Sequence, residues 1–157
     1  MDIDAQVRFA VATIPGVEDR QFRSLLEEAF RRSSTAVVGG SRARQALGCG
    51  TCRPDSDLDV GFGSLTPAQA GRVIRRVTAV GPLQLEDTRI VPGNQTVDIP
   101  PIQSPEEFFQ RSGVRAGNDP KRGRPFDPSG SYTFHLNGSI TVFPPGGQPV
   151  VMAPGGF

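Results

Sequence analysis

The sequence predicts a single domain of the α/β (α+β) class, with a short mixed sheet flanked by helices and a C-terminal β-hairpin. Segments with helical spacing alternate with short apolar segments of strand character along the first two thirds of the chain. Near the C-terminus, Asn137-Gly138 separates two strand-like runs, and Asn-Gly is the strongest short-range hairpin signal. A chain of 157 residues is also the size of one domain with its own core.

The first half of the chain is predicted to form a helix, a strand, a short helix and a second strand. Residues 17–32 place apolar side chains on one face at spacings of three and four. Residues 36–38 read as a short buried strand, and residues 42–47 as a short helix ended by Gly48. The second strand is predicted over 57–62, because Leu58, Val60 and Phe62 alternate with more polar or smaller residues.

The second half begins with a capped helix. Thr66 and Gln69 form a capping box with Pro67 in the first turn, and the helix is expected to reach Val80. Residues 83–91 and 95–99 are expected to form a hairpin, and 104–112 a short helix. The predicted organisation is therefore a core over about 17–112, a basic loop over 113–130 and a terminal hairpin over 131–145, all in one domain over 1–157.

The composition excludes several classes of partner. A formal net charge of +1 rules out a strongly basic coat, so any contact with nucleic acid needs a local patch. No run approaches the roughly 20 apolar residues that cross a bilayer, so no membrane partner is expected. The N-terminal residues lack the pattern of a signal peptide, so nothing in this segment is expected to send the chain across a membrane. The expected site of action is the cytoplasm.

Two cysteines, Cys49 and Cys52, lie in a loop that contains Gly and Pro. A structural zinc site needs four ligands, and His135 is the only histidine in the sequence. Two readings stay open, a clasp across the loop or two free thiols, and redox chemistry is the less favoured third.

The chemistry of the sequence centres on Asp57 and Asp59. Strand periodicity places both carboxylates on one face, with Leu58 directed to the core. Two close carboxylates repel each other, and a hard cation such as Mg²⁺ or Mn²⁺ relieves that repulsion. Asp98 is the preferred third carboxylate of a two-metal site, with Glu86 and Asp87 in reserve.

The loop before these aspartates suits a phosphate. Gly39 and Gly40 allow backbone amides to approach an anion, Ser41 adds a hydroxyl, and the next helix directs its N-terminus the same way. Arg42 or Arg44, one turn further on, can neutralise developing charge.

Together, Val37-Val38-Gly39-Gly40-Ser41-Arg42-Ala43-Arg44 and Ser56-Asp57-Leu58-Asp59-Val60 resemble the signature of the nucleotidyltransferase superfamily, the polymerase-beta-like fold, and especially its minimal members. The resemblance implies that Gly40 and Ser41 hold the triphosphate of a nucleoside triphosphate. It also implies that Asp57 and Asp59 bind metal ions, and that a later carboxylate, Asp98, helps to activate the acceptor hydroxyl. One departure is the spacing: fifteen residues, 42–56, separate Ser41 from Asp57, which is longer than usual in minimal members.

The acceptor is predicted from a basic stretch and from a looser resemblance. The stretch contains Arg111, Arg115, Lys121, Arg122 and Arg124, which suit the phosphates of an RNA such as tRNA. A solvated loop is the equally weighted alternative. Aromatic residues of the terminal hairpin either stack on bases or, as we favour, cover the edge of the sheet. His135 is expected at the surface.

The C-terminal organisation also resembles the toxin modules of bacterial polymorphic toxins. That resemblance implies a fragment of a larger secreted protein, delivered into a target cell and blocked by a cognate immunity protein. Three functions follow: nucleotidyl transfer to RNA, transfer to a protein or an aminoglycoside-like small molecule, or a non-catalytic module that binds nucleotide or a partner.

Overall fold

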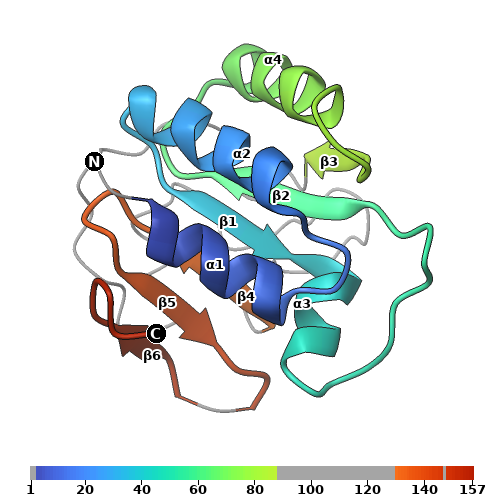
Figure 1. Ribbon diagram of the computed structural model, residues 1–157, viewed down its shortest axis with the longest axis vertical. Helices are drawn as coiled ribbons and strands as arrows, with labels where there is room; N and C mark the ends of the chain where they lie inside the picture. Colours follow the sequence, from blue (N-terminus) through green and yellow to red (C-terminus); the bar gives the residue numbers. More distant parts are fainter. Residues whose placement is uncertain (1–2, 88–129, 147) are drawn as a thin grey trace.

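The described residues form a six-stranded mixed sheet with helices packed on it (Figure 1). The computed structural model describes residues 3–87, 130–146 and 148–157. The helices are α1 (Asp4–Thr13), α2 (Asp19–Arg31), α3 (Gly40–Ala46) and α4 (Pro67–Thr78). The strands are β1 (Ala36–Gly39), β2 (Leu58–Phe62), β3 (Leu85–Asp87), β4 (Ser131–Phe134), β5 (Ile140–Phe143) and β6 (Val150–Met152).

The order of the strands places β1 and β4 at the centre of the sheet. Across the sheet the order is β3-β2-β1-β4-β5-β6. β2 and β3 are parallel, whereas the other neighbours pair in antiparallel fashion. The predicted mixed sheet flanked by helices is therefore confirmed. The terminal hairpin, however, is not an appendage, because β4 pairs directly with β1.

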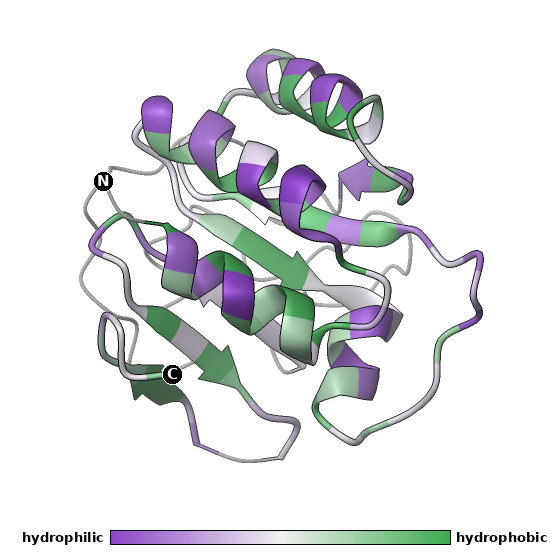
Figure 2. Cartoon of the chain, viewed as in Figure 1, coloured by the Kyte–Doolittle hydropathy of each residue, from purple (hydrophilic) through white to green (hydrophobic). Residues whose placement is uncertain are grey.

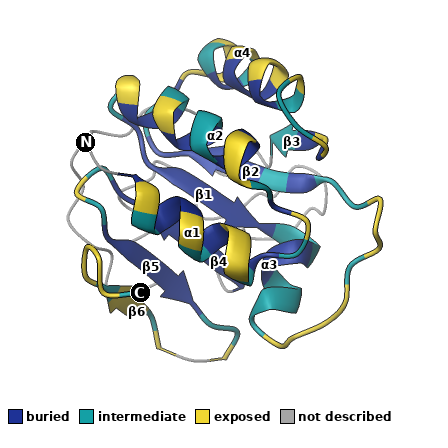
Figure 3. Ribbon diagram, viewed as in Figure 1, coloured by how far each residue is buried: buried dark blue, intermediate teal, exposed yellow. Residues whose placement is uncertain are grey.

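One face of the sheet packs against α1, α2 and α4 (Figure 1). Alternate residues of each strand enter this core, among them Val38, Val60 and Phe134, all essentially without solvent exposure. The apolar sides of α2 and α4 face the same core, and their charged sides face outward (Figure 2). Buried residues consequently fill the central strands and the inner helix faces (Figure 3).

The capping signal at Thr66 locates the start of α4 correctly. The Thr66 hydroxyl accepts the amide of Gln69 at 3.2 Å, and the Gln69 side chain accepts the amide of Thr66 at 2.9 Å. This is the predicted capping box, although α4 ends at Thr78 rather than Val80. The hairpin turn is also confirmed, since Gly138 has a φ of +91° between β4 and β5.

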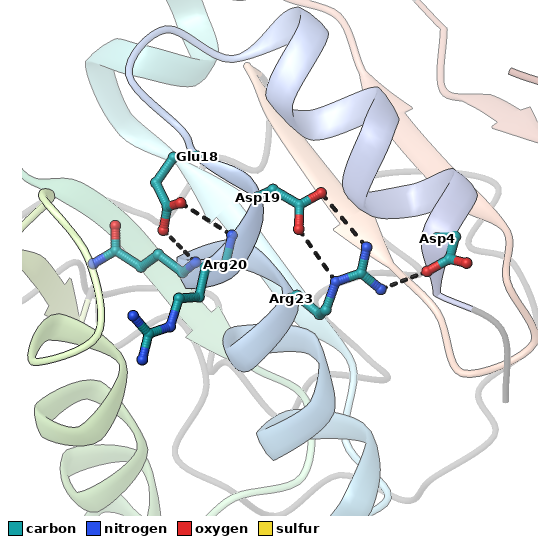
Figure 4. Close-up of polar contacts among 6 residues, drawn as sticks. Asp4, Glu18, Asp19, Arg20 and Arg23 are labelled. Atoms are coloured by element: carbon teal, nitrogen blue, oxygen red, sulfur yellow. Dashed lines mark hydrogen bonds and ion pairs between the residues drawn. The ribbon is translucent and has the colours of Figure 1, made fainter.

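Helix α1 packs in the same core, and the sequence did not predict it. Its amphipathic pattern is weak, since its buried residues are Gln6, Val7 and Ala10. Gln6 donates to the carbonyls of His135 and Ser139, at 3.0 and 3.1 Å, and so ties α1 to the terminal hairpin. An ion-paired arginine of α2 also holds α1, because Arg23 contacts both Asp4 and Asp19 (Figure 4).

The aromatic residues of the terminal hairpin neither form a stacking surface nor cover an edge of the sheet, because β4 is a central strand and all three are buried. Tyr132, Phe134 and Phe143 have exposed fractions of 2%, 0% and 2%. Phe134 packs edge-on against Phe22 of α2, with ring centroids 5.0 Å apart. Base stacking on these three rings is therefore excluded.

The expectation that His135 lies at the surface is wrong. His135 follows the central strand β4 and is buried, and its Nε2 lies 2.8 Å from the Thr141 hydroxyl. Its Nδ1 has no hydrogen-bond partner in the described part of the chain. Burial in this setting lowers the pKa of His135 to about 4.

This buried histidine predicts a loss of stability in mild acid. The ordinary pKa is 6.5, so the unfolded chain binds more protons than the fold between pH 6.5 and 4. The contribution of neutral His135 to the free energy of unfolding is complete above pH 6.5 and decreases toward pH 4. At pH 4.5 the free energy of unfolding should be lower by about 2 kcal/mol. Urea unfolding at pH 7 and 4.5 should show this loss in the native protein but not in His135→Gln. An equal decline in both proteins would contradict the assignment.

Several predicted elements lie outside the described residues. They are the strand residues after Asp87, the strand over 95–99, the helix over 104–112 and the basic loop over 113–129. Within the described residues, none of the helices is long and apolar enough to span a membrane.

Candidate functional site

Three of the predicted site residues, Gly39, Gly40 and Asp59, meet where the two neighbouring strands β1 and β2 pair. β1 ends at Gly39 and continues directly into α3, while β2 begins at Leu58 (Figure 1). The antiparallel register pairs Gly39 with Asp59. Residues that are twenty positions apart in the sequence therefore lie side by side.

The contact between Gly40 and Asp59 defines this site. Gly40 has a φ of +72°, a conformation that favours glycine. A Cβ built on Gly40 would lie 1.6 Å from Oδ2 and 2.6 Å from Cγ of Asp59. The carboxylate thus occupies the space that any side chain at position 40 would need. The glycine loop and the aspartate strand form one unit.

Asp59 is the second residue of β2, and Asp57 directly precedes the strand. Leu58, between them, is buried in the core, and Asp57 and Asp59 are each partly exposed. The amide of Leu58 donates to the carbonyl of Gln84 at 2.8 Å, which extends the pairing of β2 with the segment before β3. The carboxylates therefore belong to a paired, anchored segment rather than to a loose loop.

The reserve choice for a third carboxylate lies next to Asp59. In the parallel pairing of β2 with β3, Asp59 is the register partner of Glu86. Neighbouring strands are about 4.8 Å apart, and register partners project from the same face of the sheet. Asp87 is the partner of Val60 and so belongs to the opposite face.

The preferred third carboxylate, Asp98, lies outside the described residues. Within the part of the chain that the structure describes, no group of three acidic, histidine or cysteine side chains is close enough to hold a metal ion. Asp57 and Asp59 stay candidate metal ligands, with Glu86 as the nearest carboxylate by register.

Ser41 and Arg44 both lie on α3, which starts at Gly40. Ser41 is partly exposed in the first turn, next to the Gly40–Asp59 contact. Arg44 is also partly exposed, and a Cβ on Gly130 would lie 2.9 Å from its Cγ. Its stem therefore runs along the turn that leads into β4.

Arg42 points away from solvent and is bound by carbonyl groups. It is 3% exposed, although it is an arginine in a seven-residue helix. Nη1 donates to Pro15 O at 2.9 Å and Nη2 to Pro54 O at 3.0 Å. Nε and Nη2 both donate to Ser56 O, at 2.9 and 2.6 Å. The sequence assigned Arg42 to the nucleotide, but its donors are directed to the protein backbone.

The loop between α3 and β2 carries both cysteines as free thiols. Cys49 is exposed and Cys52 partly exposed, and each backbone amide is held by α3. The Cys49 amide donates to Arg44 O at 2.9 Å, and the Cys52 amide to Gln45 Oε1 at 2.7 Å. Of the two readings left open by the sequence, the structure shows free thiols.

Replacing both cysteines by serine is expected to leave activity largely unchanged. The loop is anchored through backbone amides, which Cys49→Ser and Cys52→Ser retain. Turnover and thermal stability of the double variant, compared with the native protein under reducing conditions, check this expectation. A total loss of turnover would show that the thiols themselves are functional.

The structure brings Gly39 and Gly40 beside Asp59, while Ser41 follows Gly40 in α3 and Asp57 lies two residues before Asp59. The predicted acceptor residues lie outside the described residues. Sequence reasoning did not predict the burial and carbonyl partners of Arg42, because these partners lie 12, 14 and 27 positions away in the sequence. Gly16 was the one available signal. Its φ is +79°, and a Cβ there would lie 2.5 Å from Nη1 of Arg42.

Comparisons of the chain with protein-family models, with curated proteins and with solved structures gave no significant match.

Proposed function

We propose that this protein is a metal-dependent nucleotidyltransferase with a polymerase-beta-like core. In this proposal it binds a nucleoside triphosphate at Gly39, Gly40 and Ser41 and uses Asp57 and Asp59 as metal ligands. The acceptor is a hydroxyl group, with RNA such as tRNA as the first choice.

The contact between Gly40 and Asp59 carries the proposal. A glycine-serine turn or a pair of alternating aspartates is common when either occurs alone. Here the Asp59 carboxylate lies against the Cα of Gly40, and β1 and β2 pair in the register that this contact requires. A triphosphate held by the turn would therefore lie beside the carboxylates.

The side chains of the site fit Mg²⁺ or Mn²⁺. Asp57 and Asp59 supply hard oxygen ligands from an anchored strand, and Glu86 lies beside Asp59 in register. Asp98 remains the preferred third carboxylate from the sequence. A bound divalent cation would neutralise charge on the phosphates and on the attacking oxygen.

The proposed reaction is a substitution at the α-phosphorus. The acceptor hydroxyl oxygen forms a bond to the α-phosphorus, and the bond from that phosphorus to the α–β bridging oxygen breaks. Pyrophosphate leaves, and the hydroxyl proton passes to a carboxylate of the site. In this scheme the chain orients the triphosphate through its backbone and holds the carboxylates in place.

Salt dependence distinguishes an RNA acceptor from the alternatives. Binding to tRNA through several arginines and a lysine would weaken steeply as salt increases. A protein hydroxyl or an aminoglycoside-like acceptor would be less sensitive. Filter binding of labelled tRNA across a salt series, with and without Mg²⁺ and nucleotide, separates these acceptors.

The toxin setting rests on the resemblance of the C-terminal organisation. In that setting the protein acts in the cytoplasm of a target cell after delivery, and an immunity protein blocks the site. Expression in bacteria tests the toxin setting. The native protein should arrest growth, whereas the double variant with Asp57→Asn and Asp59→Asn should not.

Calorimetry with each nucleoside triphosphate tests the proposal before any acceptor is known. We expect saturable binding of one triphosphate in Mg²⁺ and much weaker binding in EDTA. Binding that is indifferent to metal would favour a non-catalytic nucleotide module, and no binding would overturn the proposal.

A further inference from the structure

Arg42 is a buried cation in the middle of backbone carbonyls. Its side chain forms no ion pair with an acidic residue in the described part of the chain. Burying a guanidinium is costly unless its donors are satisfied. Here the donors Nε, Nη1 and Nη2 all bind carbonyl oxygens, at 2.6 to 3.0 Å.

The carbonyls come from two segments that flank the site. Pro15 belongs to the connection between α1 and α2, whereas Pro54 and Ser56 belong to the loop that precedes β2. Ser56 is the residue directly before Asp57 and receives two of the four hydrogen bonds. Arg42 therefore joins the helix that carries Ser41 to the backbone that carries Asp57.

The rest of the loop end is ordered by its own hydrogen bonds. The Ser56 amide donates to Arg53 O at 3.0 Å, and the Arg53 amide donates to Ser56 Oγ at 3.1 Å. This turn lies within the stretch that makes the spacing between Ser41 and Asp57 longer than usual. A long connection permits many positions of Asp57, so contacts that hold the end of this loop restrict them.

Gly16 completes the arrangement. A Cβ at this residue would lie 2.5 Å from Nη1 and 3.2 Å from Cζ of Arg42. The guanidinium therefore lies against the bare Cα of Gly16, which lets Nη1 reach Pro15 O.

We propose that Arg42 is the positioning residue of Asp57: through Ser56 it fixes this carboxylate relative to the Gly40-Ser41 turn. The expected effect on metal binding and rate rests on the proposed nucleotidyl transfer. The expected effect on the position of Ser56 and Asp57 does not depend on it. Arg42 binds the backbone rather than the triphosphate, and Arg44 remains the arginine of α3 available for phosphate.

Two variants and a matched control test this role. Arg42→Lys retains the charge but cannot reach three carbonyls at once. Gly16→Ala retains Arg42 but displaces its guanidinium group. This variant tests the same role if Arg42→Lys fails to fold. Gln45→Ala is the control, because it releases the same loop at Cys52 but leaves Ser56 held.

The catalytic readouts are Mn²⁺ binding by electron paramagnetic resonance and pyrophosphate release from the four ribonucleoside triphosphates with total RNA. Displacing Asp57 by about 1 Å should lower kcat on the order of 10²-fold. We expect Arg42→Lys to weaken Mn²⁺ binding and to raise the Mg²⁺ concentration for half-maximal rate, while KM for the triphosphate is retained. A raised KM with an unchanged metal requirement would place Arg42 on the triphosphate and overturn the proposal.

Hydrogen exchange of the peptide over 53–58 separates failure of this inference from failure of the proposed function. Arg42→Lys and Gly16→Ala should accelerate its exchange, and Gln45→Ala should leave it nearly unchanged. If the native protein neither binds Mn²⁺ nor releases pyrophosphate, the transferase proposal falls, and faster exchange still upholds the positioning role. Unchanged exchange in both variants refutes the positioning role whether or not the protein is a transferase.

Discussion

Replacing Asp57 and Asp59 together by asparagine is expected to abolish nucleotidyl transfer and to leave the fold intact. The amides retain the size of the carboxylates but lose the charge that binds a divalent cation. Metal stabilisation of the reacting phosphate is worth several kcal/mol, so the rate should fall on the order of 10³-fold or more. The measurement is single-turnover transfer of labelled nucleotide by the double variant and the native protein.

A neighbouring aspartate supplies the control for that experiment. Asp55 lies two residues before Asp57, and its side chain is 82% exposed. It pairs with an exposed arginine, Arg53, at 3.7 Å. Asp55→Asn should keep both rate and stability, because exposed pairs contribute little. The double variant should also unfold at the native midpoint or slightly above it in EDTA, since carboxylate repulsion is relieved. Full activity in the double variant would disprove the proposed metal site.

Gly40→Ala is expected to have the second largest effect, because it acts on the contact that joins the two halves of the site. Its Cβ would lie 1.6 Å from Oδ2 of Asp59, so the carboxylate or the turn has to move. The positive φ adds about 1–2 kcal/mol of backbone strain for any L-residue. A shift of about 1 Å in Asp59 should cost on the order of 10²-fold in rate.

Gly48→Ala is the control that separates the effect of the Gly40–Asp59 contact from the backbone strain of an alanine at positive φ. Gly48 lies just beyond the other end of α3 with a φ of +78°, and a Cβ there would meet nothing within 4 Å. It should lose about 1–2 kcal/mol of stability and keep its activity. Urea unfolding and transfer rates of both variants give the comparison. Equal losses of activity in the two variants would show that the Gly40–Asp59 contact has no functional role.

Local signals in the sequence predicted most of the elements because each signal acts within a few residues. The capping box at Thr66, the Asn137-Gly138 turn and the alternation around Leu58 all appear where expected. The combined motif assigned Gly40 and Asp59 to one site, and the register of β1 with β2 brings the two residues into contact.

Long-range contacts decided what the sequence could not predict. Helix α1 is stabilised by bonds from Gln6 to residues more than 120 positions away, so its own weak pattern gave no signal. His135 is buried because β4 inserts beside β1, a pairing between distant segments. The sequence predicted that Arg42 binds phosphate, because the position of Arg42 in the motif is visible in the sequence. Its carbonyl partners are distant in the chain and give no sequence signal.

The measurement that tests the central claim most directly is transfer from each α-³²P-labelled nucleoside triphosphate in Mg²⁺. Total bacterial RNA and lysate proteins serve as acceptors, and the products are separated on denaturing gels. The proposal predicts label from one triphosphate on tRNA, absent in EDTA and in the variant with Asp57→Asn and Asp59→Asn. Label on a protein band would retain the chemistry and change the acceptor. No label on RNA or protein, together with no nucleotide binding by calorimetry, would contradict the claim that this chain transfers nucleotides.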